Sequence, residues 1–198
     1  MQEKKVAIDA QIVEQIKRKN TDAFRLFVER YQKRLYFMCF DLTGNHHDAE
    51  DLSQDVFIKV FRSAHQLRDN QDIEGWLYRI AVNAFLDKKR KRINRILRFW
   101  LDAEDQNIDS IDSGSTHRPD TATDESLIRH HIQKALKKLS ARERAVFVLR
   151  HYQDYSLYEI AQTLSIAEGT VKSLLFRAAK KLRPLLANCV GQIMEDAR

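Results

Sequence analysis

The segment YSLYEIAQTLSIAEGTVKSLLFRAAKKLR, residues 155–183, predicts two short helices joined by a tight turn. Ser156 and Glu159 form a capping box, in which the serine hydroxyl and the glutamate carboxylate each bond a free backbone N–H. Apolar residues then recur every three or four positions on both sides of a turn near 165–167, as in two amphipathic helices. Ala161 is small where the two helices would cross closely.

The second of these helices is expected to be cationic. Its basic residues are Lys172, Arg177, Lys180, Lys181 and Arg183. Two helices, a short turn and a basic second helix are typical of a helix-turn-helix, whose second helix lies in a DNA major groove. The alternative is an αα-hairpin in an ordinary bundle. The agreement of small, apolar and basic positions favours DNA binding.

The composition predicts an all-α protein. The chain has 198 residues, of which 43% are hydrophobic and 31% charged, so it can build a core. Its 5 glycines and 2 prolines are too few for a turn-rich β fold. The net charge of +6 suits a polyanionic partner.

Other function classes find little support. Cys39 and Cys189 lie among apolar residues without a CxxC pair, so we expect buried thiols, no metal and no cofactor. The adjacent His46 and His47 point about 100° apart on a helix and chelate one ion poorly. No signal peptide and no apolar run of about 18 residues is present, which predicts a cytoplasmic protein without membrane insertion.

The N-terminal half reads as a series of helices. Apolar spacing predicts a short amphipathic helix within residues 1–20 and a longer helix over 22–42. Asn20 or Thr21 can cap the longer helix, and Gly44 stands where a glycine would end it. Asn45 can then cap a further helix, whose buried face begins at Ala49.

An acidic patch occupies the first half of that further helix. Acidic residues in a first turn favour the helix dipole, so part of the patch needs no function. Asp51, Gln54 and Asp55 nevertheless lie on one side, at positions i, i+3 and i+4. A solvated face and a docking surface both remain open.

A polar loop over 65–75 precedes an aromatic and basic helix that begins at Trp76. Tyr78, Arg79 and Asn83 add a ring, a cation and an amide, and residues 88–92 are five cations in a row. The run could be merely solvated. Nucleic-acid contact is favoured because unpaired bases stack on aromatic faces and amides read base edges.

A change in composition divides the chain. Residues 101–124 are acidic and then rich in Ser, Thr, Gly and Pro, which predicts a flexible linker. The expected organisation is a helical domain over 1–100, the acidic linker, and a four-helix domain over 125–198. Ser140 and Glu143 repeat the capping box inside the second domain. The tail after Pro184 has no clear assignment.

Three ordered segments resemble the extracytoplasmic-function (ECF) class of bacterial RNA polymerase sigma factors. They are DAEDLSQDVFIKVF, IEGWLYRIAVNAFLDKKRK and LSARERAVFVLRHYQDYSLYEIAQTLSIAEGTVKSLLFRAAKKLR. The likeness covers residues from about 20 to 186, with a linker where the family has one. It implies a non-enzymatic protein that binds core RNA polymerase and directs it to promoters, with an anti-sigma factor as a further partner.

The resemblance also implies roles for individual residues. Asp51, Gln54 and Asp55 would dock on the polymerase's largest subunit, and the acidic linker would thread the RNA path of the polymerase. Recognition and melting of the minus-ten element would fall to Ile73, Glu74, Trp76, Tyr78, Arg79, Ile80, Asn83, Lys88, Lys89 and Arg90. Contacts with duplex DNA at the minus-thirty-five element would fall to Thr170, Lys172, Ser173, Phe176 and Arg177.

The chain departs from the family at two positions. Ser165 stands where such turns usually have Gly, and Leu174 stands where many members have Arg, which removes one expected DNA contact. Two other function classes compete with the resemblance. A self-contained helix-turn-helix regulator would need no polymerase-docking face, and a helical metal hydrolase would need a ligand set that the sequence does not supply.

Overall fold

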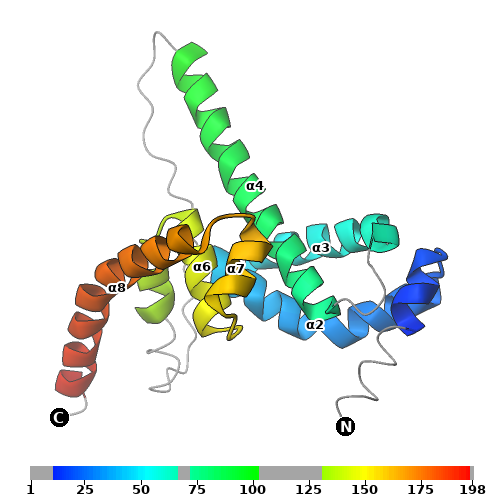
Figure 1. Ribbon diagram of the computed structural model, residues 1–198. Coiled ribbons are helices and arrows are strands. Elements are labelled where there is room, and N and C mark those ends of the chain that lie inside the picture. The colour runs from blue at the N-terminus through cyan, green and yellow to red at the C-terminus, as the bar shows by residue number, and fades with distance from the viewer. Residues whose placement is uncertain (1–10, 67–71, 103–130, 197–198) are drawn as a thin grey trace.

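The computed structural model of the chain describes residues 11–66, 72–102 and 131–196, and all its regular elements there are helices (Figure 1). The all-α prediction is therefore confirmed. Within those ranges, no helix combines the length and the apolar character that crossing a membrane requires. The predicted linker lies almost wholly outside the described residues, so the proposed domain boundaries stay predictions.

Helix α2 (Thr21–Thr43) begins and ends at the caps that the sequence predicted, and helix α3 (His46–Ser63) begins at its predicted cap. The Asn20 side chain accepts hydrogen bonds from two backbone N–H groups of the first turn of α2. Gly44 ends α2 at φ 79°, a left-handed conformation that glycine adopts without strain. Asn45 caps α3, which closes the hairpin between the two helices.

Helix α4 (Ile73–Asp102) begins earlier than the sequence indicated. The carboxylate of Asp72 accepts hydrogen bonds from the backbone N–H groups of Glu74 and Gly75, at 3.1 and 3.0 Å. This is N-capping geometry. The prediction of a loop through residue 75 was therefore wrong at its end, and Ile73 and Glu74 belong to the first helical turn. Beyond α3 lies the short helix η1 (Ala64–Gln66).

The C-terminal half contains α6 (Ala141–His151), α7 (Leu157–Leu164) and α8 (Glu168–Asp196). Both predicted capping boxes, at Ser140 and Ser156, are present. The turn between α7 and α8 passes through Ser165 at φ 53°, so the serine adopts the left-handed conformation that a glycine would adopt there. The backbone of α8 stays helical past Pro184.

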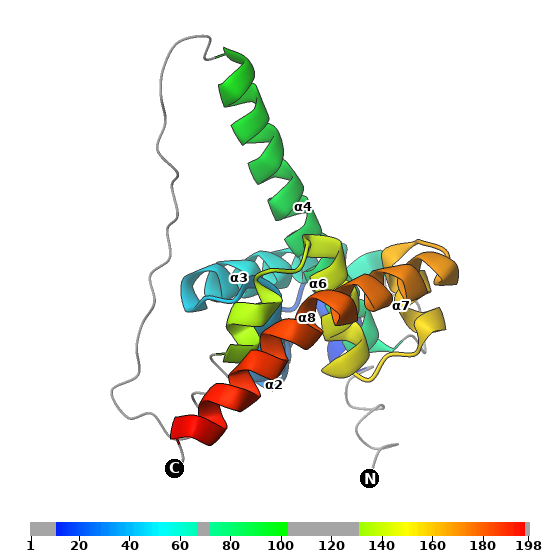
Figure 2. The ribbon, with the colours of Figure 1, turned by 90° about the vertical axis from the view of Figure 1, so that its left-hand side faces the viewer.

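The two halves of the chain pack against each other. One hydrophobic core includes Leu42 and Leu77 from the N-terminal half together with Val146, Leu149 and Ile160 from the C-terminal half. A smaller core joins Ala135, Leu136 and Leu139 to Ala178 and Leu182. α6 packs against α2 and α4, α7 packs against α4, and α8 packs against α6 and α7. Figure 2 shows the C-terminal part of α4 extending away from the other helices.

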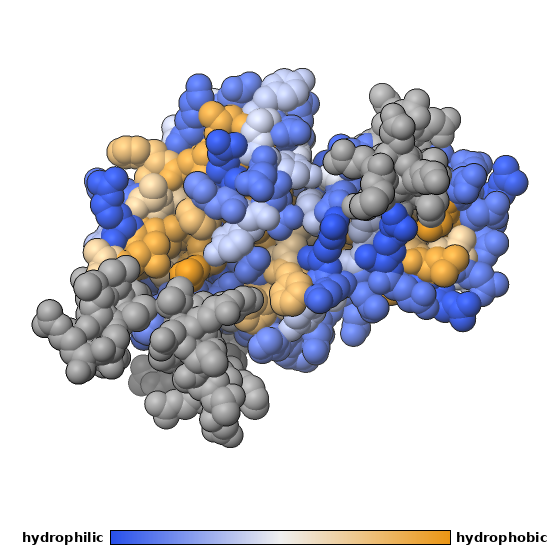
Figure 3. Space-filling model, turned by 90° about the horizontal axis from the view of Figure 1, so that it is seen from below, coloured by the Kyte–Doolittle hydropathy of each residue, from blue (hydrophilic) through white to orange (hydrophobic). Residues whose placement is uncertain are grey.

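The surface keeps some apolar side chains in contact with solvent. Large exposed examples are Leu26, Phe37, Ile58 and Phe176. On the face seen from below, apolar residues form patches between hydrophilic side chains (Figure 3). Apolar side chains scattered singly over a surface are normal in folded proteins and do not by themselves mark a binding site.

Candidate docking face and nucleic-acid interfaces

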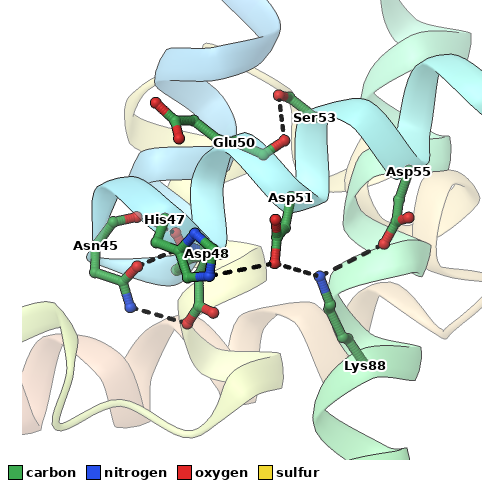
Figure 4. Close-up of polar contacts among 9 residues, drawn as sticks. Asn45, His47, Asp48, Glu50, Asp51, Ser53, Asp55 and Lys88 are labelled. Carbon is green, nitrogen blue, oxygen red and sulfur yellow. Dashed lines mark hydrogen bonds and ion pairs between the residues drawn. The ribbon is translucent and has the colours of Figure 1, made fainter. Parts of the chain in front are cut away.

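The acidic residues of α3 that the sequence placed on one side share one partner. The Lys88 ammonium from α4 lies 3.5 Å from the Asp55 carboxylate and 4.0 Å from that of Asp51 (Figure 4). Gln54, which lies between Asp51 and Asp55 in the sequence, is exposed. Both carboxylates remain about half exposed, so the face is open to solvent. We call Asp51, Gln54 and Asp55 the acidic face.

Other polar groups near the start of α3 are engaged locally. The Asn45 side chain accepts from the Asp48 N–H at 2.6 Å and donates to the Asp48 carboxylate at 2.9 Å, so Asp48 belongs to the helix cap. His46 shares a hydrogen bond with the Tyr36 hydroxyl, and His47 lies 4.0 Å from Asp51. Each of the two histidines thus has a polar neighbour within the chain.

The aromatic side of α4 faces inward. Ile73, Trp76 and Tyr78 are 9%, 5% and 4% exposed, and Ile80 is partly buried. The side chains that the resemblance assigns to an unstacked base are therefore largely covered in this conformation.

A polar network holds Tyr78 in that position. Its hydroxyl donates to the Glu74 carboxylate at 2.8 Å, and both oxygens of that carboxylate accept from Arg34 at 2.9 Å. Burial, and then the bond to Glu74, raises the pKa of Tyr78 well above its usual value. Sequence reasoning missed Arg34, which carries no local signal for a partner 40 residues away.

The outward side of α4 carries a separate polar stripe. Arg79, Asn83 and Arg90 are exposed. At about 100° per residue, the three lie within about 40° of one another around the helix axis. Lys88 is about 140–180° away from each of them, on the side that meets the acidic face. We call Arg79, Asn83 and Arg90 the outer stripe.

Lys89 differs from its basic neighbours. Its ammonium lies 5.7 Å from the centre of the Phe85 ring, and its side chain is partly buried. Burial is the largest influence on Lys89 and lowers the pKa of its ammonium. Arg90 pairs instead with Asp87 at 3.0 Å. The predicted five-cation run is therefore divided among at least three environments.

The predicted DNA-reading residues of α8 lie together. Thr170, Lys172, Ser173, Phe176 and Arg177 are all exposed, and the last four line one shallow hollow. The Ser173 hydroxyl donates to the Gly169 carbonyl at 2.9 Å, and Arg177 Nε donates to the Ser173 carbonyl at 3.4 Å. These bonds hold both side chains along the helix surface.

The Leu174 departure has a structural reason. Its side chain is only 4% exposed and belongs to the core beneath α8. A leucine at this position therefore buries apolar surface in the core, whereas the charged end of an arginine would have to reach out of the core into solvent. The expected loss of one DNA contact here is accompanied by a gain in packing.

A partly buried ion pair braces the helix-turn-helix, with the lysine side chain about half exposed. The Lys181 ammonium lies 2.7 Å from the carboxylate of Glu143, whose side chain is 4% exposed. Burial acts to raise the pKa of Glu143, but the bonds from Lys181 and Ser140 outweigh it and leave the pKa below its usual value. The first turn of α6 is thereby tied to the middle of α8.

Two families match the chain in the same order as its helices. Residues 27–105 match Sigma-70 region 2, and residues 129–182 match Sigma-70, region 4. The first match covers most of α2 and all of α3 and α4, together with the acidic face and the outer stripe. The second covers α6, α7 and the exposed face of α8.

Curated relatives align with most of the length of this chain. The ECF RNA polymerase sigma factor SigW of Bacillus subtilis is 32% identical over 88% of this chain and 94% of its own length. The ECF RNA polymerase sigma factor SigE of Mycolicibacterium smegmatis is 35% identical over 86% of this chain and 64% of its own length.

Solved structures share the fold. The sigma factor RpoE of Bartonella quintana, crystallised with the anti-sigma factor NepR, aligns at a TM-score of 0.62 with 27% identity, over 83% of this chain and 96% of that one. CnrH, solved with the cytosolic domain of CnrY, aligns at 0.59 with 21% identity, over 91% and 98%. The second likeness concerns the fold alone.

Proposed function

Because this chain belongs to the ECF class of RNA polymerase sigma factors, we propose that it binds core RNA polymerase and directs it to specific promoters. Such a factor is not an enzyme. It acts through surfaces that contact polymerase and DNA. The observation that carries the proposal is the order of three exposed polar surfaces along the two matched regions: the acidic face, the outer stripe and the exposed face of α8.

The acidic face is the proposed docking surface for the polymerase's largest subunit. Its two carboxylates are half exposed and lie within reach of one ammonium, so cations of a partner could approach them in the same way. Complementary charges on two surfaces speed their encounter and fix their register.

The outer stripe is the proposed surface for the minus-ten element. Arg79 and Arg90 can contact phosphates, and the Asn83 amide can read a base edge. The buried rings of Trp76 and Tyr78 would have to become accessible before they could hold an unstacked base.

The exposed face of α8 is the proposed surface for the minus-thirty-five element. It presents two cations, two hydroxyls and the Phe176 ring, which is 71% exposed. A helix that carries these groups on one side suits the major groove of a closed duplex. An anti-sigma factor and a cytoplasmic location complete the proposal, in line with the resemblance of the fold to a sigma factor solved with its anti-sigma factor.

The direct test is reconstitution. The purified chain should co-elute with core RNA polymerase and produce defined run-off transcripts from genomic fragments. The Asp51→Ala, Gln54→Ala double variant serves as the matched control and should lose most of both activities. A chain that binds DNA tightly alone but never associates with polymerase would instead be a self-contained regulator.

A further inference from the structure

A carboxylate in the first turn of α4 is held by two other side chains. Both oxygens of Glu74 accept hydrogen bonds from Nη1 of Arg34 in α2, each at 2.9 Å. Glu74 Oε1 also accepts a hydrogen bond from the Tyr78 hydroxyl at 2.8 Å. The backbone N–H of Glu74 donates to the capping carboxylate of Asp72 at 3.1 Å. The backbone and the side chain of Glu74 are thus both fixed in direction. We call Arg34, Glu74 and Tyr78 the carboxylate clamp.

The clamp orients Glu74 more than it stabilises the fold. The side chains of Arg34 and Glu74 are 54% and 31% exposed, and water screens ion pairs at such positions. One nitrogen reaches both carboxylate oxygens, so the carboxylate cannot turn without losing a hydrogen bond. The arginine also offsets the negative charge of Glu74, which would otherwise repel the phosphates of bound DNA.

A count of lone pairs leaves one free acceptor site on the clamped carboxylate. Each carboxylate oxygen has two lone pairs. Oε1 uses both, for Arg34 and Tyr78, whereas Oε2 accepts from Arg34 alone among the residues that the structure describes. Because a carboxylate accepts and does not donate, a group that binds at Oε2 must bring one N–H or O–H donor.

Cytosine and adenine match this site better than the other two bases when unpaired. Each carries an amino group, at N4 of cytosine and N6 of adenine, beside a ring nitrogen that only accepts. Thymine has no amino group, and its N3–H lies between two carbonyl oxygens that a carboxylate repels. Guanine presents two adjacent N–H donors on this edge, of which Oε2 accepts one. The other donor would lose its water without gaining a partner.

We propose that Arg34 is a positioning residue for minus-ten recognition, which holds Glu74 so that its one free acceptor site selects cytosine or adenine as an unpaired base. The inference rests on the proposed function. Arg34 acts through Glu74 and does not itself contact DNA.

The place of Glu74 on α4 suits an extruded base. Glu74 lies about 14 Å along the helix axis from Asn83 and about 180° around it, at about 1.5 Å and 100° per residue. The DNA strand follows the outer stripe, and one base turns out of the stack around the start of the helix, as bases do when enzymes extrude them. Glu74 and Asn83 therefore contact different nucleotides of the same strand.

The base preference can be measured in the complex of core polymerase with the wild-type chain. A premelted template with a randomised minus-ten element removes the opening step, and sequencing of the bound fraction reports the preference. At one unpaired position, cytosine or adenine should be favoured about tenfold over thymine and guanine, the effect of one hydrogen bond to a charged group. Pyrimidin-2-one in place of that cytosine, or purine in place of that adenine, lacks only the amino group and should lose the same factor.

Variants of the clamp should change this preference in different ways. Glu74→Gln should abolish it, because the amide can donate as well as accept. Arg34→Met should instead admit guanine, because both oxygens then have a free lone pair for its two adjacent donors. In the Glu74→Gln background, Arg34→Met should have no further effect on base preference, since Arg34 acts through Glu74.

Two further variants separate positioning from a general loss of charge. Arg34→Lys keeps a cation with three N–H donors and should retain most of the preference. Lys33→Met removes the neighbouring exposed cation of α2 and should leave the preference unchanged.

The outcomes distinguish this inference from the proposed function. The inference is overturned if no unpaired position favours cytosine or adenine in the wild-type complex, or if the analogues without the amino group bind as well as the natural bases. An Arg34→Met factor with the wild-type base profile overturns it too, as does a Lys33→Met factor with an altered one. Run-off transcripts from a wild-type complex without the preference would leave the sigma function standing. A chain that never binds core polymerase would overturn both.

Discussion

Lys88 offers a sharp test of the docking face because it occupies that face from within the same chain. Its ammonium lies 3.5 Å from Asp55 and 4.0 Å from Asp51, and all three side chains are about half exposed. A polymerase cation that docks on these carboxylates must displace or share Lys88. We therefore expect Lys88→Met to tighten binding to core polymerase.

The size of the effect follows from the exposure. Half-exposed ion pairs contribute about 0.2–1 kcal/mol each. If Lys88→Met removes one such competing pair, the affinity for core polymerase should rise about 1.4- to 5-fold. The gain should shrink as salt rises, since the screening length falls to about 3 Å at 1 M. Titration of labelled chain with core polymerase at several salt concentrations measures it.

Arg90→Met is the matched control. Arg90 is also exposed and basic, but it pairs with Asp87 and lies on the opposite side of α4. It should leave affinity for core polymerase unchanged and reduce the salt slope of promoter binding by about 0.9 per lost phosphate contact. If Lys88→Met weakens polymerase binding, or lowers the salt slope as Arg90→Met does, Lys88 is a DNA contact and the reasoning fails.

Three further outcomes are expected. Asp51→Ala with Gln54→Ala should weaken core binding while circular dichroism and the melting temperature stay near wild type; retained binding would remove the docking face. Arg177→Ala should lower affinity for the upstream element by about 1–3 kcal/mol if the arginine contacts a base edge. Asn83→Ala should instead impair strand opening in permanganate footprints, and a premelted template should rescue it. Equal rescue of both variants would refute the assignment of α4 to opening and α8 to duplex binding. The pKa of Glu143 is lowered in the folded state, so the ionised carboxylate stabilises the fold above about pH 4.5, and this contribution is lost as pH falls through the folded pKa. The difference in free energy of unfolding between wild type and Glu143→Gln, measured by urea titration, should therefore shrink in acid.

The helix ends were predictable because their determinants are local. The side chains of Asn20, Asn45, Ser140 and Ser156 bond backbone groups two or three residues away, and Gly44 supplies the left-handed turn. Spacing of a few residues is visible in a sequence without knowledge of the fold.

One local determinant was overlooked. Asp72 caps α4, and an Asp just before an apolar residue is a recognised helix start. The surrounding polar residues favoured a longer loop instead. The side on which Leu174 lies was also overlooked. Leu174 comes three residues after Val171 and four before Ala178, so helical spacing places it on the side of α8 that faces the core.

Long-range contacts were beyond the sequence for a physical reason. Arg34 meets Glu74 across 40 positions, and Arg144 meets the Asp41 carbonyl across 103. Periodicity shows that a residue lies on one side of its helix, but not which helix lies opposite. The exposed charges were therefore assigned to external partners, although several of them are engaged inside the chain.

The two sides of α4 explain how one helix could serve two partners at once. Lys88 faces α3 and the proposed polymerase surface, whereas Arg79, Asn83 and Arg90 lie about 140–180° away, toward solvent. DNA bound along the outer stripe would thus lie on the far side of α4 from the acidic face, whose carboxylates would otherwise repel its phosphates. A factor that must hold polymerase and open DNA in the same complex requires such a separation. The helical register of the basic run, rather than its net charge, would then decide which cation meets which partner.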